Sequence, residues 1–243
     1  MARTSRDTRT NRPAAKRRPA RAVTERPAAR QRRTAGETPY HHGDLHDALL
    51  AAAERVLERD GLPGLTLRAV AREAGVSHAA PTHHFGDLSG LLSELAAIGF
   101  RRFNAAMVAA GKTEAQPLMK ALARAKAYVA YAQAQPGMYG LMFRTERLDM
   151  TRPSLHEAAT ASFEGLASAV GAGRNEPTGE ALEALSLDQA AAIARAWSLV
   201  HGFTTLLLDG RLKDILHRLP DGTGVDQLLD AMLRSTVPRP AVA

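Results

Sequence analysis

The side chains with the most binding chemistry lie close together between residues 66 and 84. Most are hydroxyls and imidazoles, which can hydrogen-bond to phosphate oxygens and to the edges of nucleic-acid bases, and one is a small apolar residue suited to a thymine methyl. The set comprises Thr66, Ser77, His78, Ala79, Thr82, His83 and His84. Residues 77–85 contain no Arg or Lys, so the bidentate contact of Arg with guanine cannot come from this stretch.

A second group of polar residues could suggest a metal site. His42 and His46 are four residues apart, a spacing that places them on one face of a helix, and Asp44 lies between them. No third ligand recurs at helical spacing, and polar residues are common where a helix begins. We therefore expect no metal ion and no cofactor.

The local sequence places the first set of side chains on two short helices. Thr66 can cap a helix over residues 67–74, and Gly75 can end that helix in a left-handed conformation. Ser77 can then cap a third helix that reaches Phe85.

Small and β-branched residues allow these two helices to pack closely. Val70, Ala71 and Val76 can lie between them, and Pro81 would be the fourth residue of the third helix, where it disturbs only the first turn. This is the layout of a helix-turn-helix, whose second helix can enter a major groove.

The rest of the chain also indicates helices, so we expect an all-α fold. No strand-like alternation of four or more residues occurs after residue 39, and apolar residues recur at helical spacing. The helices are expected at 44–60, 67–74, 77–85, 88–110, 117–135, 153–170, 187–208 and 225–234, with a short apolar piece at 138–143 and a loop at 171–179.

Charge and composition divide the chain. The formal net charge is +7, yet residues 1–39 carry twelve Arg or Lys residues against three acidic ones, and very few large aliphatic residues. Such a segment cannot offset its ordering entropy, so we expect a disordered Arg-rich arm, which either contacts phosphates or is a solvated extension upstream of the true start. The other expected boundaries are 40–87 for the helix-turn-helix, 88–236 for a helical domain and 237–243 for a tail.

The helix-turn-helix region is not basic. Residues 40–92 hold four arginines and seven carboxylates. One hypothesis is that the arm supplies the missing phosphate neutralisation. A second is that the histidines act as cations, because their reference pKa of about 6.5 lies close to neutral pH. The competing interpretation is that they are neutral donors.

Several functional classes lack support. The 243 residues include no cysteine, which excludes disulfides and cysteine nucleophiles, and no phosphate loop, nucleophile elbow or HExxH pair, so we expect no enzyme. The most apolar stretch, 189–208, holds Arg195 and His201 and is a poor membrane span. No signal-peptide core follows the Arg pairs of the arm. We expect a cytoplasmic protein without a membrane partner.

An ordered set of motifs resembles the tetracycline-repressor family (the TetR/AcrR type). The similarity to its DNA-binding unit is carried by YHHGDL at 40–45, GVSHAAP at 75–81, HF at 84–85 and LL at 91–92. Pro136-x-x-Tyr139-x-Leu141-Met142-Phe143 and Trp197-x-x-x-His201-Gly202 resemble the regulatory domain of the subfamily named for its Trp-His-Gly signature. Together the motifs span residues 40–234.

The resemblance implies a homodimeric, sequence-specific transcription regulator, a repressor that a small apolar ligand releases from a near-palindromic DNA operator. It adds Tyr40, His42, Arg68 and Pro81 to the residues expected at the DNA.

Two residues depart from the family pattern. Thr82 stands where the family usually has Tyr, and Leu88 where it often has Lys; in relatives these two positions commonly touch phosphates. A nonspecific architectural DNA-binding protein, and a ligand-binding relative that has lost DNA specificity, therefore stay open as alternatives.

The helical domain is expected to bind the ligand and to form the dimer. Met and aromatic side chains shape adaptable apolar sites, although each could equally belong to the core. The pocket candidates are Tyr128, Tyr131, Met138, Tyr139, Met142, Phe143, Phe163, Trp197 and His201. The helix at 187–208 is apolar on nearly every face, and by resemblance it joins the last helix in a four-helix dimer seam. The interface candidates are Ala190, Ala194, Ser198, Gly202, Leu228 and Met232.

Overall fold

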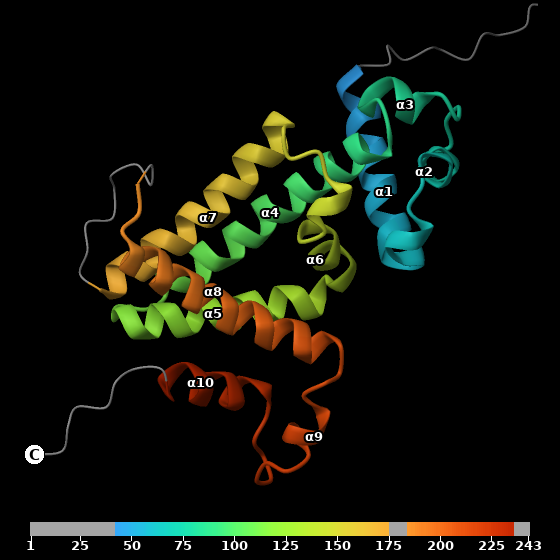
Figure 1. Ribbon diagram of the computed structural model, residues 1–243. Coiled ribbons are helices and arrows are strands. Elements are labelled where there is room, and N and C mark those ends of the chain that lie inside the picture. The colour runs from blue at the N-terminus through green and yellow to red at the C-terminus, as the bar shows by residue number, and fades with distance from the viewer. Residues whose placement is uncertain (1–41, 175–183, 236–243) are drawn as a thin grey trace, which may run out of the picture. The chain divides into compact units, whose positions relative to one another are not determined.

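The computed structural model describes residues 42–174 and 184–235, and all regular secondary structure in these ranges is helical. The expectations for residues 1–39 and 237–243 lie outside the described residues. The elements, shown in Figure 1, are α1 (His42–Gly64), α2 (Leu67–Ala74), α3 (Ala80–Phe85), α4 (Leu88–Lys112), α5 (Pro117–Ala134), α6 (Pro136–Met142), the 3-10 turn η1 (Thr145–Arg147), α7 (Pro153–Gly173), α8 (Leu187–Leu208), α9 (Lys213–Leu216) and α10 (Val225–Ser235).

Helices α1 to α3 form the headpiece, the part that holds the helix-turn-helix. Leu49 and Val56 of α1, Val70 of α2 and Phe85 of α3 are almost completely buried in one apolar cluster. Gly61 has φ 68° and interrupts α1, which confirms the predicted end of the regular helix, and one further turn follows it. Glycine suits this position because L side chains rarely adopt positive φ.

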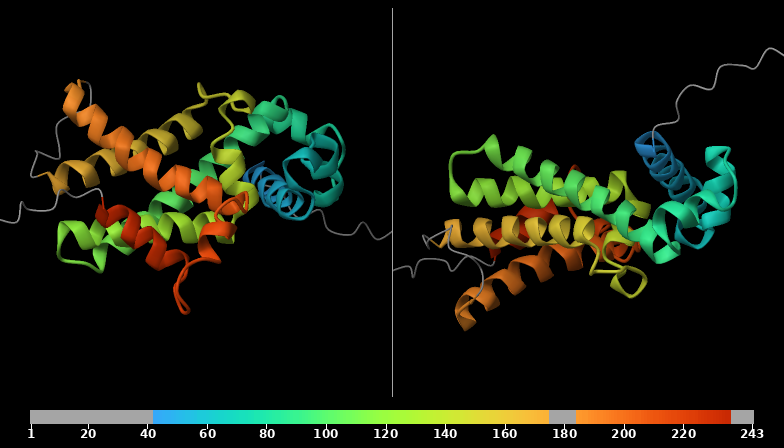
Figure 2. Two further views of the ribbon diagram at one scale, coloured as in Figure 1. Left: turned by 60° about the horizontal axis from the view of Figure 1, so that its bottom comes forward. Right: turned by 90° about the horizontal axis from the view of Figure 1, so that it is seen from above.

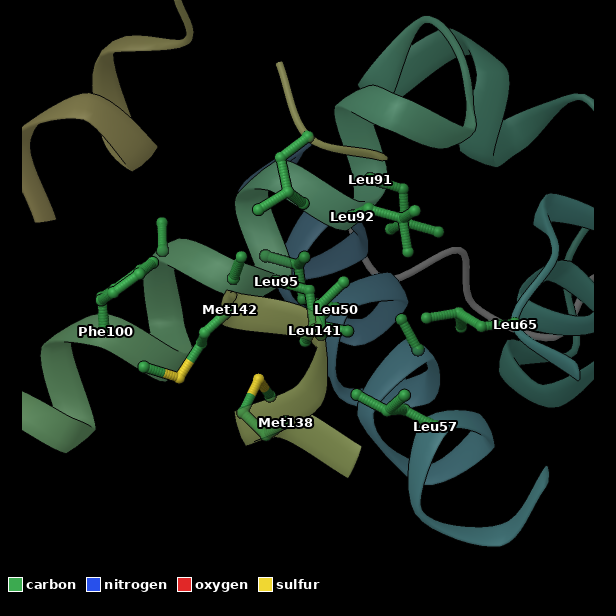
Figure 3. Packing of buried hydrophobic residues seen from close by; sticks show 14 of the residues in the cluster. Leu50, Leu57, Leu65, Leu91, Leu92, Leu95, Phe100, Met138, Leu141 and Met142 are labelled. Carbon is green, nitrogen blue, oxygen red and sulfur yellow. The ribbon is translucent and has the colours of Figure 1, made fainter. Parts of the chain in front are cut away.

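Helix α4 belongs to both halves of the described fold. It begins at Leu88 and is capped by Asp87, whose Oδ1 accepts a hydrogen bond from the Gly90 N–H at 2.8 Å. Its first turns contact α1 and α3, and its length packs against α5, α6 and α7 (Figure 2). Figure 3 shows the shared core, in which Leu50, Leu95 and Leu141 from α1, α4 and α6 meet.

Helices α5 and α6 meet at a single residue. Gln135 ends α5 and precedes α6, with φ −132° and ψ 57°, and Pro136 occupies the start of α6, where its missing N–H costs little. The prediction that α5 ends at Pro136 is confirmed, but α6 begins two residues before the expected start at Met138.

The last helices pack on the other side of α5. Both α8 and α10 contact α5, and Val129, Phe203 and Leu229 bury their side chains in this second cluster. The structure corrects two expectations here: α7 continues to Gly173, so residues 171–173 are not loop, and α9 was not foreseen. By length and apolar composition α8 is the one candidate membrane span in the described residues; a single such helix is weak support, and α8 packs against α5 and α7.

Candidate DNA interface and ligand cavity

The turn between α2 and α3 forms as the sequence predicts. Thr66 caps α2, its Oγ1 accepting from the Ala69 N–H at 3.1 Å. Gly75 adopts the left-handed conformation, φ 69° and ψ 28°, and its N–H donates to the carbonyl groups of Ala71 and Arg72. Glycine adopts this conformation without a steric penalty, so the chain can reverse here and project α3 from the headpiece.

The start of α3 differs from the prediction. Ser77 does not cap it; the carbonyl of Ser77 accepts from the Ala80 N–H at 3.0 Å, which closes a turn, and α3 begins at Ala80. Pro81 therefore lies in the first turn of the helix. Its side chain is buried, so Pro81 cannot contact DNA as predicted.

Most of the other DNA candidates are exposed on one part of the headpiece. The exposed candidates are Thr66, Arg68, Ser77, His78, Ala79, Thr82 and His83. His84 is half-buried, with its ring centroid 5.5 Å from that of His83 and 6.2 Å from that of His46. Tyr40 and the side chain of His42 lie outside the described residues.

Ion pairs leave two headpiece arginines available. Arg55 and Arg59 both bind Glu73, each with a 2.9 Å contact, and these hydrogen bonds lower the pKa of the Glu73 carboxyl. Arg68 and Arg72, in contrast, are exposed on α2 and make no side-chain hydrogen bond or ion pair within the ranges 42–174 and 184–235. Sequence reasoning missed Arg72, although its spacing of four residues from Arg68 places both on one helix face.

Leu88 has a structural role. Its side chain is half-buried against the cluster that contains Phe85 and Leu91. The departure from Lys at this position therefore replaces a polar contact by apolar packing at the start of α4.

A cavity of about 640 Å³ lies between α4, α5, α7 and α8 and has a mainly apolar lining. Its volume falls within the range of pockets that hold drug-sized ligands. Five of the predicted pocket residues line it: Tyr128, Met142, Phe143, Phe163 and Trp197.

Four other predicted pocket residues do not line this cavity. Met138 is buried beside Gly99 of α4, and the Tyr131 hydroxyl donates to the Gly99 carbonyl at 3.2 Å. Tyr139 and His201 form a polar cluster with Tyr128 next to the cavity, at one edge of its lining.

The polar cluster consists of neutral groups from three helices. His201 Nδ1 of α8 lies 2.8 Å from the Tyr128 hydroxyl of α5 and 2.9 Å from the Tyr139 hydroxyl of α6. Burial raises the pKa of both phenols and lowers the pKa of His201. The cluster therefore holds the three helices together without a formal charge.

No group of three or more His, Asp or Glu side chains suitable for a metal ion occurs in the part of the chain that the structure describes.

Two family models match the sequence, and they match the two structural halves. Residues 49–95 match the model described as bacterial regulatory proteins of the tetR family. Residues 119–236 match the tetracyclin repressor-like C-terminal domain. The chain belongs to the tetracycline-repressor family. It is a helix-turn-helix transcription regulator that binds DNA, and regulators of this family are not enzymes.

Several solved structures are similar to this chain. A protein of unknown function from Rhodococcus sp. RHA1 is 36% identical, with a TM-score of 0.64, and the match covers 82% of this chain and 98% of that one. Two structures below 25% identity share the fold. The tetR-family regulator PfmR from Thermus thermophilus has 19% identity, coverage of 76% and 97%, and a TM-score of 0.52. A tetR-family regulatory protein from Rhodococcus RHA1 has 16% identity and a TM-score of 0.53, and the match covers 78% of this chain and 95% of that one. A search of curated proteins gave no match.

The predicted dimer residues of this tetracycline-repressor family member lie in two different environments, one on α8 and one on α10. Ala194 and Ser198 are exposed, Ala190 is half-buried, and a side chain added at Gly202 would meet open space. Leu228 and Met232 of α10 are half-buried against the second apolar cluster of the same chain.

Several contacts join the regulatory helices to the headpiece, among them an ion pair between Arg102 of α4 and Glu54 of α1. An Arg152 Nη2 group, at the start of α7, donates to the carbonyl of Phe85 at the end of α3 across 2.5 Å. A side chain added at Gly137 of α6 would lie 3.4 Å from Leu57 of α1, so these helices also approach closely. Helices α4 and α6, and Arg152 at the start of α7, are therefore in direct contact with the headpiece.

Proposed function

We propose that this regulator is a repressor that binds a near-palindromic operator as a homodimer and leaves it when a small apolar molecule occupies the cavity. The observation that supports this most is shared use of α4 and α7. Both helices line the cavity. Both also contact α3: α4 does so through its first turns, and α7 does so through Arg152 at its start. A ligand that prefers one spacing of α4 and α7 thereby favours one position of the recognition helix.

The proposed operator contacts are the exposed headpiece residues. Base contacts come from His78, Ala79, Thr82 and His83 at the start and along the exposed face of α3. Phosphate contacts come from Thr66, Arg68, Arg72 and Ser77, and by family resemblance from Tyr40 and His42.

The proposed dimer seam is the exposed face of α8 together with α10. Support comes from the apolar side chains that α8 leaves exposed, Leu206 at 42% and Leu187 at 85%, and from the open space over Gly202. Two-fold symmetry would place the recognition helices one DNA turn apart, ~34 Å. The Trp197 to Gly202 motif supports assignment to the Trp-His-Gly subgroup, and membership of this family of DNA-binding regulators supports a cytoplasmic location.

Selection of binding sites from random duplex DNA with the purified protein tests the proposal. We expect an enriched near-palindrome with half-sites one helical turn apart, bound by a dimer in gel-shift assays. Equal affinity for all duplexes would favour an architectural protein. Binding of small molecules without any DNA binding would favour a relative that has lost its operator.

A further inference from the structure

The cavity carries cations as well as apolar side chains. Arg124 of α5, Arg195 of α8 and Arg174 at the end of α7 all line it, and no Asp or Glu is among its described lining residues. The three arginines come from separate helices. A ligand bound in this cavity would therefore contact positively charged groups as well as apolar side chains.

Arg124 and Arg195 have unused hydrogen-bonding capacity. Neither makes an ion pair or a side-chain hydrogen bond with the residues at 42–174 and 184–235. Arg124 is half-buried against α4, since a side chain added at Gly111 would lie 2.6 Å from its Nε. Arg195 is exposed. A guanidinium has five N–H donors and cannot lose its charge, so an anion in the cavity could pair with Arg124 and Arg195 without displacing a partner in the described residues.

The cavity is also long. Its lining residues on α7 run from Ala159 to Gly173, which at a rise of 1.5 Å per residue spans roughly 21 Å. Arg124 and Arg195 lie in the first halves of α5 and α8, whereas Met142 and Phe143 lie at the end of α6, where the ring centroids of Phe100 and Phe143 are 5.8 Å apart. Phe100 and Met142, the lining residues next to Phe143, are apolar, whereas the three arginines lie on α5, on α8 and at the end of α7.

We infer that the effector is an elongated apolar molecule with one anionic head group, a long-chain carboxylate or phosphate, with its head between Arg124 and Arg195 and its chain directed toward Phe143. That the ligand acts as an effector rests on the proposed function, but the anion-binding site does not depend on that function. Carboxylates and phosphates pair bidentately with guanidinium groups.

The chain contains a built-in reporter for the test. Trp197 is its single tryptophan, lines the cavity and is 44% exposed. We would titrate the full-length protein with dodecanoate, dodecyl phosphate, neutral dodecanol and short hexanoate, and follow Trp197 fluorescence. We expect dodecanoate or dodecyl phosphate to bind at least about tenfold more tightly than dodecanol and hexanoate. The comparison of the two anions identifies the preferred head group.

Variants locate the head group. Arg124→Gln and Arg195→Gln should each weaken the preferred anion by about ten- to hundredfold and leave dodecanol unchanged. Lys120→Gln, on the same helix as Arg124 but outside the lining, is the matched control and should bind as the wild type does.

The outcomes separate the two proposals. Equal binding of dodecanol and dodecanoate, or no loss in either arginine variant, overturns the anionic site, as does failure of every probe to bind. If the charged probe binds through Arg124 and Arg195 but does not release the selected operator in a gel-shift assay, the site is supported and the proposed effector mechanism fails.

Discussion

The guanidinium of Arg152 donates a hydrogen bond to the backbone carbonyl of Phe85 across 2.5 Å, although 67 residues separate them in the chain. Arg152 also faces Glu94 at 3.6 Å and Asp149 at 3.8 Å. One side chain therefore connects the start of α7, the first turns of α4 and the end of the recognition helix.

Arg152→Ala should lower the free energy of unfolding by about 2 kcal/mol, because it leaves a carbonyl without its charged donor. Arg152→Lys should give an intermediate loss, since an ammonium lacks the planar fork that serves several acceptors. Urea denaturation measures both, with exposed Arg147→Ala as the control. Equal stability of Arg152→Ala and the control would show that the contact contributes nothing.

Gly90→Ala should weaken operator binding by at least about tenfold. A side chain at this buried position would overlap both the Phe85 carbonyl oxygen and Arg152 Nη2, so the end of α3 would have to move. Gly140→Ala in α6 is the control, because it meets open space and gains helix propensity of up to about 1 kcal/mol. Wild-type operator affinity in Gly90→Ala would contradict the described packing.

Stability should fall as the pH falls through the ordinary pKa of histidine. Burial lowers the pKa of His201 below its usual 6.5, so the unfolded chain takes up a proton before the folded chain does. The stabilisation is therefore complete at higher pH, is lost progressively below about pH 6.5, and stops changing below the folded pKa. Its facing groups, Tyr128 and Tyr139, stay neutral throughout.

Melting temperatures measured between about pH 8 and pH 5 test this linkage. His201→Gln should remove part of the slope, whereas exposed His217→Gln should leave it unchanged. Parallel curves for the wild type and His201→Gln would refute the assignment.

Arg68→Gln and Arg72→Gln should each reduce the slope of log affinity against log salt by about 0.9, the contribution of one neutralised phosphate. Each should weaken all duplexes similarly, because phosphates carry no sequence information. Filter binding from low to moderate salt measures the slope. Exposed Arg211→Gln, outside the headpiece, should not change it.

Deletion of residues 1–39 tests the arm. It carries twelve basic residues against three acidic ones, whereas in the headpiece Glu73 pairs with two of the four arginines. We expect the truncated chain to show a clearly flatter salt dependence with the same selected sequence. An unchanged slope would rule the arm out as a DNA contact.

The sequence predicted local structure best where a single residue has a specific backbone role. Thr66 and Gly75 bound α2 as expected, because a cap and a left-handed turn are decided by neighbours in the chain. Ser77 has the same capping chemistry but lies in a turn closed by Ala80, and α3 starts at Ala80 with Pro81 packed in the interior. That packing is a tertiary effect which the local sequence does not encode.

The cavity was only partly predictable for the same reason. Tyr128 and Tyr139 are both aromatic residues on helices, yet only Tyr128 lines the cavity, because the rotation of each helix about its axis is set by its neighbours. Arg124 and Arg195 would be assigned to solvated faces from the sequence, since nothing local distinguishes a cavity-lining arginine from a surface one.

The single-residue corner at Gln135 limits how the regulatory helices can move. No flexible linker separates the two helices, so a shift of α5 along its own axis displaces α6 sideways. Because Gly137, in the first turn of α6, lies against Leu57 of α1, a displacement of α6 also moves the headpiece.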